Sequence, residues 1–177
     1  MALSPQQIGK VGERLFYKLL ILGSGGKLEA YMPVADEERR DFEVHIKGKY
    51  RPILAIQVKC AARLWDDKKK GMVRLTIGFQ VPEGNIRTDR LFWYFLGCLD
   101  LDKMCFMDPV FIVPSAVMHK DARLRRRHGK QVDFDFVANM ARRSRDRWSR
   151  YQVAPLDVGK HVLQILSESS IKSLKAA

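Results

Sequence analysis

Hydrophobic positions near the start of the chain recur with helical spacing. The apolar residues from Ile8 to Leu22 follow this spacing, and the run Gly23-Ser24-Gly25-Gly26 comes directly after them. Before them, Ser4-Pro5-Gln6-Gln7 has the order of a helix start, with an N-cap serine, a proline at the first helical position and a glutamine that closes a capping box. The pattern therefore predicts a first helix of about 18 residues.

An alternating pattern replaces the helical one after residue 40. Polar and apolar residues alternate over 41–47 and again over 53–60, with a turn at 48–52 between them. Alternation of this kind is typical of strands with one face in the core. A further strand at 91–99 is almost wholly apolar, which favours a central position buried on both faces. Other strands are predicted at 28–32, 72–79, 104–106 and 110–113, the last two as a pair, with a loop at 65–71.

The predicted hairpin brings polar residues together. If its strands pair symmetrically about Tyr50, Asp41 lies opposite Lys59 and Glu43 lies opposite Gln57. Gln57 and Lys59 are two positions apart, so both side chains leave the face of the strand that is turned away from the core.

From His119 the chain becomes strongly basic. We predict a helix from about Phe134 to Tyr151 and a last amphipathic helix from about Val158 to Leu174. The stripe Val137, Met140, Ala141, Ser144 and Trp148 would pack the first of these two helices. The order of elements indicates the α/β (α+β) class: one domain, 1–177, with a mixed β-sheet flanked by helices and a basic helical portion from about residue 119.

Charge points to a polyanionic partner. The chain has 177 residues, 32 Lys+Arg against 20 Asp+Glu, and a formal net charge of +12. A domain this basic favours nucleic acid, although ribosomal and membrane-surface proteins share the property. We predict contacts to the nucleic-acid backbone by Arg123, Arg125, Arg126, Arg127, Lys130, Arg142, Arg143 and Arg147.

Several classes are disfavoured by what the sequence contains. Cysteines 60, 98 and 105 are odd in number and form no Cys-x-x-Cys, which argues against a disulfide framework. Histidines 45, 119, 128 and 161 show no zinc-binding spacing. The N-terminus does not resemble a signal peptide, and no apolar run is long enough for a membrane span, so we expect a cytoplasmic protein.

The polar residues of the hairpin have the chemistry of a phosphodiesterase. Mg²⁺ takes one or two carboxylates together with neutral oxygens, and Mn²⁺ can replace it. Asp41 would be the principal ligand, the Gln57 carbonyl a neutral second ligand, and Glu13 on the first helix an outer or second-metal ligand. Lys59 would hold the attacking water and stabilise the charge that develops on the phosphate.

The motifs Gly9-x-x-Gly12-Glu13, Asp41 and Gln57-Val58-Lys59 resemble the PD-(D/E)XK nuclease superfamily, and in pattern its archaeal Holliday-junction-resolvase-like and Mrr-like branches. The resemblance implies a restriction-endonuclease-like fold over at least residues 5–115 and a Mg²⁺-dependent DNA endonuclease. It assigns the catalytic roles to Glu13, Asp41, Gln57 and Lys59. Most members have Glu where this chain has Gln57, and no proline precedes Asp41.

Other interpretations remain open at this stage. The chain is alternatively a DNA-binding module that keeps the nuclease fold without catalysis, and charge does not distinguish DNA from RNA. Glu13 is alternatively a solvated helix residue, and Glu43 replaces Asp41 if the hairpin register differs by two. Trp148 is expected in the core rather than stacked on a base. Cutting both strands would require two sites, so a homodimer or higher oligomer is expected, with the C-terminal helix as a candidate interface.

Overall fold

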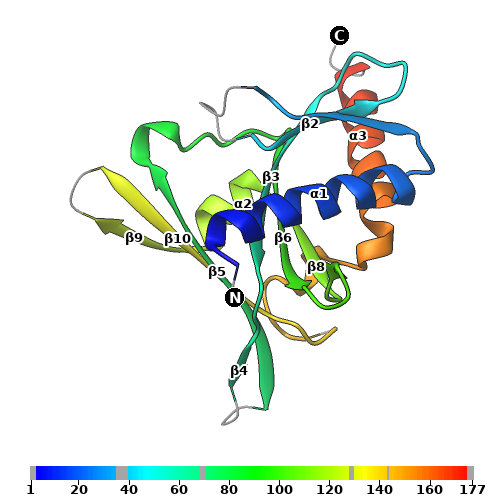
Figure 1. Ribbon diagram of the computed structural model, residues 1–177. Coiled ribbons are helices and arrows are strands. Elements are labelled where there is room, and N and C mark those ends of the chain that lie inside the picture. Colours follow the sequence, from blue (N-terminus) through cyan, green and yellow to red (C-terminus); the bar gives the residue numbers. More distant parts are fainter. Residues whose placement is uncertain (1–2, 35–39, 68–70, 128–129, 143, 175–177) are drawn as a thin grey trace.

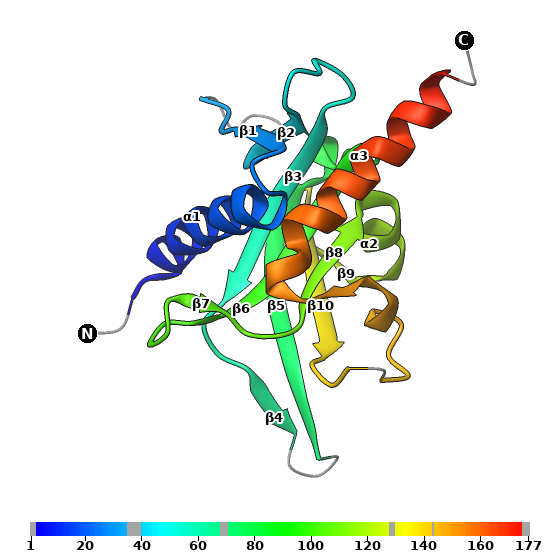
Figure 2. The ribbon, with the colours of Figure 1, turned by 90° about the vertical axis from the view of Figure 1, so that its right-hand side faces the viewer.

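The computed structural model describes residues 3–34, 40–67, 71–127, 130–142 and 144–174; for 123–127 and 171–174 it describes the backbone alone. The described chain forms three layers (Figures 1 and 2). Helices α1 (Pro5–Gly23) and α3 (Val158–Leu174) cover one face of a seven-stranded sheet, and a four-stranded sheet packs on its other face. The predicted class, a mixed sheet flanked by helices, is confirmed.

The seven-stranded sheet carries the hairpin that the sequence predicts. Its order is β1-β2-β3-β6-β8-β11, with β7 paired to β6, and only β3 and β6 run parallel among the described strands. The strands are β1 (Leu28–Tyr31), β2 (Phe42–Ile46), β3 (Leu54–Ala61), β6 (Phe92–Asp100), β7 (Cys105–Phe106), β8 (Val110–Pro114) and β11 (Gln152–Val153). The expected pairing of 104–106 with 110–113 is wrong, because β7 and β8 each pair with β6.

The second sheet has the order β4-β5-β10-β9. Its strands are β4 (Trp65–Asp67), β5 (Met72–Pro82), β9 (Arg123–Arg127) and β10 (Gln131–Asn139). Helix α2 (Ser115–Asp121) connects β8 to β9, and short 3₁₀ turns occur at Glu83–Asn85, Ser149–Tyr151 and Pro155–Asp157. The loop expected at 65–71 therefore begins with a strand, because Trp65, Asp66 and Asp67 pair with β5.

Two apolar clusters hold the three layers together. Phe16 and Leu20 of α1 and Val162 of α3 pack in the first cluster, between the helices and the large sheet. The second cluster lies between the two sheets, with Phe134 and Phe136 of β10 in it. Strand β6 contributes to both clusters, which explains its nearly unbroken apolar sequence and confirms its predicted central position.

The predicted start of α1 is confirmed in detail. The Ser4 hydroxyl accepts a hydrogen bond from the Gln7 N–H, and the Gln7 side chain accepts one from the Ser4 N–H. After the helix, Gly25 and Gly26 have positive φ values of 61° and 72°, a conformation that glycine adopts at little cost. The last helix has the bounds predicted from its pattern.

The helix predicted at about Phe134 to Tyr151 is wrong. Residues 131–139 form β10, in which Val132, Phe134, Phe136 and Ala138 are buried at alternate positions. This period of two, with aromatic and β-branched residues, is typical of a strand. The basic portion after residue 119 is consequently a β-hairpin followed by turns. Trp148 is 2% exposed, and the centroids of the Trp148 and Phe136 rings are 4.8 Å apart, as expected for a core residue.

No described helix is long and apolar enough to cross a membrane.

Candidate active site

The β2–β3 hairpin forms, but its register differs by two positions from the predicted one. Phe42 pairs with Ile56 and Glu43 pairs with Ala55. Glu43 therefore does not lie opposite Gln57, and Asp41 does not lie opposite Lys59. Continued by one pair, the observed register places Asp41 opposite Gln57, so the shift does not put Glu43 in the place of Asp41 and that alternative is wrong. A shift of two positions keeps every side chain on its predicted face, because strand side chains alternate with a period of two.

Asp41 is attached to β3 on both sides of Gln57. Its backbone N–H donates to the Ile56 carbonyl at 3.1 Å, and its carboxylate Oδ2 accepts from the Val58 N–H at 2.7 Å. The carboxylate thus satisfies a strand N–H at the point where the pairing with β2 ends. This double attachment fixes Asp41 beside Gln57, whereas Glu43 forms an ion pair with Arg40.

Gln57 is buried, although its strand face was predicted to be open. It is 3% exposed and pairs with Tyr94 of β6 on the side of the sheet that the second sheet covers. No hydrogen bond to its side-chain amide occurs within the described part of the chain. An amide that makes no hydrogen bond within the described protein can donate to or accept from a ligand that enters the site.

Lys59 lies on the same strand face as Gln57, as predicted. Its ammonium Nζ is 5.6 Å from the centroid of the Phe79 ring on β5. Among the residues that the structure describes, it forms no ion pair and no side-chain hydrogen bond. A half-buried cation held over a ring and without a carboxylate partner can interact with an anion brought to the site.

Glu13 is 8% exposed, so it does not lie on a solvated helix face. The Lys10 ammonium binds both of its carboxylate oxygens, at 2.8 and 3.1 Å. Beside it, α1 comes unusually close to β3: a Cβ added to Gly12 would lie 2.3 Å from the Cys60 Sγ. This close approach was not predicted, and its signal in the sequence is a glycine in the interior of a helix.

Three of the candidate residues influence the Cys60 thiol on β3. Burial, followed by the Asp41 carboxylate and then the Glu13 carboxylate, raises the pKa of this thiol to about 12, although the Lys59 ammonium acts to lower it. Cys60 faces α1, whereas Gln57 and Lys59 face the second sheet. Among the described residues, β2 pairs with β3 at residues 54–56 alone. The two faces of β3 meet at its edge beyond this pairing, where Asp41 lies.

The predicted metal ligands would supply two carboxylates and one amide oxygen. No group of three or more His, Cys, Asp or Glu side chains suited to a metal occurs within the described ranges. Two carboxylates and a neutral oxygen are nevertheless the hard donors that Mg²⁺ accepts while it keeps several waters. The residues present therefore fit Mg²⁺ better than a soft metal.

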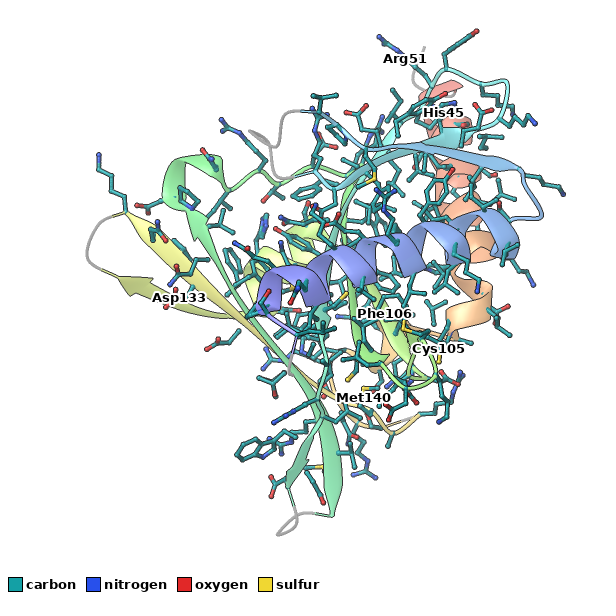
Figure 3. The ribbon with its side chains drawn as sticks, viewed as in Figure 1. His45, Arg51, Cys105, Phe106, Asp133 and Met140 are labelled. Atoms are coloured by element: carbon teal, nitrogen blue, oxygen red, sulfur yellow. The ribbon has the colours of Figure 1, made fainter. Side chains whose placement is uncertain are left out.

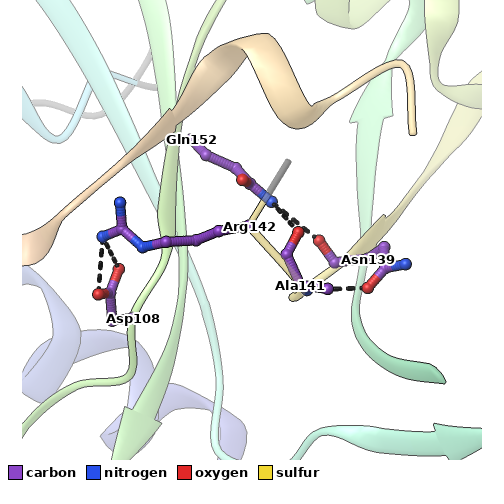
Figure 4. A network of polar contacts seen from close by, with 5 residues as sticks. All are labelled: Asp108, Asn139, Ala141, Arg142 and Gln152. Atoms are coloured by element: carbon purple, nitrogen blue, oxygen red, sulfur yellow. Dashed lines mark hydrogen bonds and ion pairs between the residues drawn. The ribbon is translucent and has the colours of Figure 1, made fainter. Parts of the chain in front are cut away.

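The predicted basic contacts are only partly described. Arg123, Arg125, Arg126 and Arg127 lie in β9, of which the backbone alone is described, and Arg143 lies outside the described residues. Lys130 is exposed at the β9–β10 turn. Arg142 binds Asp108 at 2.6 Å (Figure 4), and Arg147 donates to the Asp121 carbonyl at 2.9 Å. Contacts from these residues to nucleic acid stay a prediction.

The contact between Gly12 and Cys60 gives a stability prediction. Gly12→Ala should lower the free energy of unfolding by about 1–3 kcal/mol, because the new methyl group overlaps the Cys60 sulfur. Adding Cys60→Ala should recover part of the loss. Gly9→Ala is the matched control: nothing lies within 4 Å of its added Cβ, so alanine should be neutral or stabilising there. Urea unfolding of the parent and the three variants measures this, and equal effects at positions 9 and 12 would contradict it.

Comparison with known proteins supports the fold class. No protein-family model matches the chain, and no curated protein matches it in sequence. Among solved structures, it is similar to the bacterial homing endonuclease I-Ssp6803I, with a TM-score of 0.57 and 15% identity, over 96% of this chain and 98% of that one. The similarity extends over nearly the whole of both chains, so the described fold resembles that of this nuclease. At 15% identity the similarity concerns the fold alone.

Proposed function

We propose that this chain is a metal-dependent DNA endonuclease of the PD-(D/E)XK type. The observation that carries the proposal is the placement of Asp41, which bonds to the residues on both sides of the buried Gln57, with Lys59 on the same strand face. Glu13 is buried on α1 and lies close enough to Cys60 to affect its pKa. A nuclease-like fold in the solved structure of similar architecture supports this interpretation.

Each residue has a chemical role in the proposed reaction. Asp41 and the Gln57 carbonyl would hold a Mg²⁺ ion, with Glu13 as an outer ligand. When bound, the metal polarises the phosphate and makes its water a better nucleophile. Lys59 would orient that water and stabilise the negative charge that grows on the phosphate oxygens, because its ammonium has no competing carboxylate among the described residues. Lys10 forms an ion pair with Glu13 in the structure.

The second candidate is a DNA-binding module that has lost catalysis. Gln57 favours it, because an amide in place of a carboxylate removes one negative charge from the metal site and should weaken metal binding. A cleavage assay separates the two candidates: supercoiled plasmid and branched DNA are incubated with Mg²⁺, with Mn²⁺ or with a chelator. Nicked or linear products that depend on the metal support the enzyme, and intact DNA that is nevertheless bound supports the module.

Gln57→Glu provides a second test, which asks whether residue 57 is a metal ligand. In an enzyme the added carboxylate should increase affinity for Mg²⁺, so the metal concentration for half-maximal cleavage should fall. In a binding module the substitution creates no activity and leaves the Mg²⁺ dependence of thermal unfolding unchanged. Ala55→Glu, two positions earlier on the same strand face, serves as a control for the added charge. An Mg²⁺ titration that is identical for the parent and Gln57→Glu would contradict a ligand role for Gln57.

Oligomeric state is part of the same proposal. Hydrolysis of both strands of a duplex needs two sites, so we expect a homodimer or higher oligomer on DNA. The apolar side of α3 is already used within the chain, because Val158, Val162 and Leu166 are buried in the first cluster.

A further inference from the structure

The β2–β3 turn, the loop before β6 and the C-terminal part of α3 form a basic pocket at the end of β3 far from Lys59. The cations Lys49, Arg51 and Arg90 line this pocket, of about 720 Å³, together with Pro52, Ile53, Leu91 and, from α3, Ser169 and Ser170. No Asp or Glu is among its described lining residues. Figure 3 shows Arg51 at the end of the molecule, beyond the body of the large sheet. We call this surface the hairpin pocket.

The three cations of the hairpin pocket are exposed and have no carboxylate partner in the described part of the chain. Other arginines are engaged: Arg74 binds Asp67, and Arg142 binds Asp108. Cations held near one another without counter-charges repel, which costs stability unless an anion is bound. Three such groups around one pocket are therefore suited to a polyanion.

A second pocket lies beside the hairpin pocket and extends along β3 toward Gln57 as far as Ala55. It shares Ile53 and Leu91 with the hairpin pocket and also contains Arg87 and Ala55. Ala55 lies two positions before Gln57, so it shares the strand face of the candidate site. Glu43 in this pocket is paired with Arg40, and the Asp89 carboxylate accepts a hydrogen bond from the Leu91 N–H. The lining of the second pocket is thus close to neutral, and the basic charge lies in the hairpin pocket.

We propose that the hairpin pocket binds the phosphate backbone of duplex DNA on one side of the cut, several base pairs from the scissile phosphate. The inference rests on the proposed function, because the position of the cut is that of the proposed active site. From Leu54 to Lys59 the strand spans about 17 Å at ~3.3 Å per residue. At a rise of 3.4 Å per base pair, this places the contact about five base pairs from the site.

Tyr50 suits the same ligand. It stands between Lys49 and Arg51 on the turn and is 89% exposed. A tyrosine hydroxyl is one of the side-chain groups that hydrogen-bond to phosphate oxygens, as Lys and Arg do. Backbone contacts of this kind position a duplex without reading its sequence.

The test uses the triple variant Lys49→Gln, Arg51→Gln and Arg90→Gln. Binding to a fluorescein-labelled 30-base-pair duplex is measured by anisotropy in Ca²⁺, over a range of salt concentrations. If all three cations contact phosphates, the slope of log K against log salt should become shallower by about 2.7, since each contact contributes about 0.9. At 0.1 M salt the same relation gives about an eightfold loss of affinity per contact.

The matched control removes the same charge elsewhere. Lys18→Gln, Lys27→Gln and Lys160→Gln are exposed positions on α1, before β1 and on α3. This control triple should retain the slope of the parent. Equal losses in both triples would overturn the proposal, because they would report net charge alone. Circular dichroism and thermal unfolding verify that both triples are folded.

Two further arms locate the contact and separate the inference from the proposed function. Single-stranded DNA of the same length should show a smaller difference between variant and parent; an equal or larger difference would overturn the choice of duplex. If the parent cuts DNA and the hairpin-pocket triple binds DNA as well as the control triple does, this inference is wrong and the proposed nuclease function stands. If the parent binds DNA without cutting it and the hairpin-pocket triple binds more weakly, the hairpin pocket is supported and the proposed catalysis is wrong. Absence of DNA binding by the parent overturns both.

Discussion

Replacing Lys59 with methionine is expected to reduce the rate of DNA cleavage by about a hundredfold or more while the protein remains folded. Methionine keeps an unbranched apolar stem that can still pack against Phe79 on β5. It removes the ammonium that would orient the water and stabilise the phosphate. The loss should therefore appear in the rate of the chemical step rather than in DNA affinity.

Single-turnover cleavage of plasmid with saturating protein isolates that step. Lys160→Gln on α3 removes one charge from an exposed position and should cut at the parent rate. Thermal unfolding should place Lys59→Met at or above the stability of the parent, because a half-buried charge is lost. Cleavage by Lys59→Met at the parent rate would show that the active-site assignment is wrong.

Local signals in the sequence determine some elements well. The capping box at Ser4 and Gln7 and the glycines after Leu22 fix both ends of α1, because each residue satisfies a specific need of a helix terminus. The alternation over 41–47 and 53–60 likewise predicts the hairpin. These features depend on a few neighbouring residues, which is why they could be recognised without the tertiary structure.

Features that depend on distant parts of the chain were predicted less well. Alternation shows which residues share a strand face, but it does not show what covers that face. The second sheet covers it here, so Gln57 is buried where an open face was expected. The hairpin register also depends on how many turn residues pair, which the alternation does not show. Because the error in register was two positions, the candidate side chains still lie on their predicted faces.

The error in the basic region has a different cause. Arginines at 142, 143, 145, 147 and 150 suggested a solvated helix surface, while the apolar residues at 132, 134, 136 and 138 alternate with a period of two. The apolar spacing decides the structure, because these side chains enter the core between the sheets. The charges do not oppose either conformation.

Asp41 permits a separation of structural and catalytic roles, because its carboxylate accepts a hydrogen bond from the Val58 N–H. In Asp41→Asn the amide oxygen can still accept this bond, whereas the negative charge for a metal is lost. In Asp41→Ala both are lost. We therefore expect both variants to cut DNA at least about a hundredfold more slowly, since each lacks the principal metal ligand.

Stability should distinguish the two variants. Asp41→Ala leaves the Val58 N–H without its partner, which should lower the free energy of unfolding by about 1–3 kcal/mol, and Asp41→Asn should remain close to the parent. Mg²⁺ provides a readout that does not require cleavage: it should raise the melting temperature of the parent, because a ligand that binds the native state stabilises it. The melting temperature of Asp41→Asn should respond much less. A parent-like response to Mg²⁺ in Asp41→Asn would remove Asp41 from the metal site even if cleavage were lost.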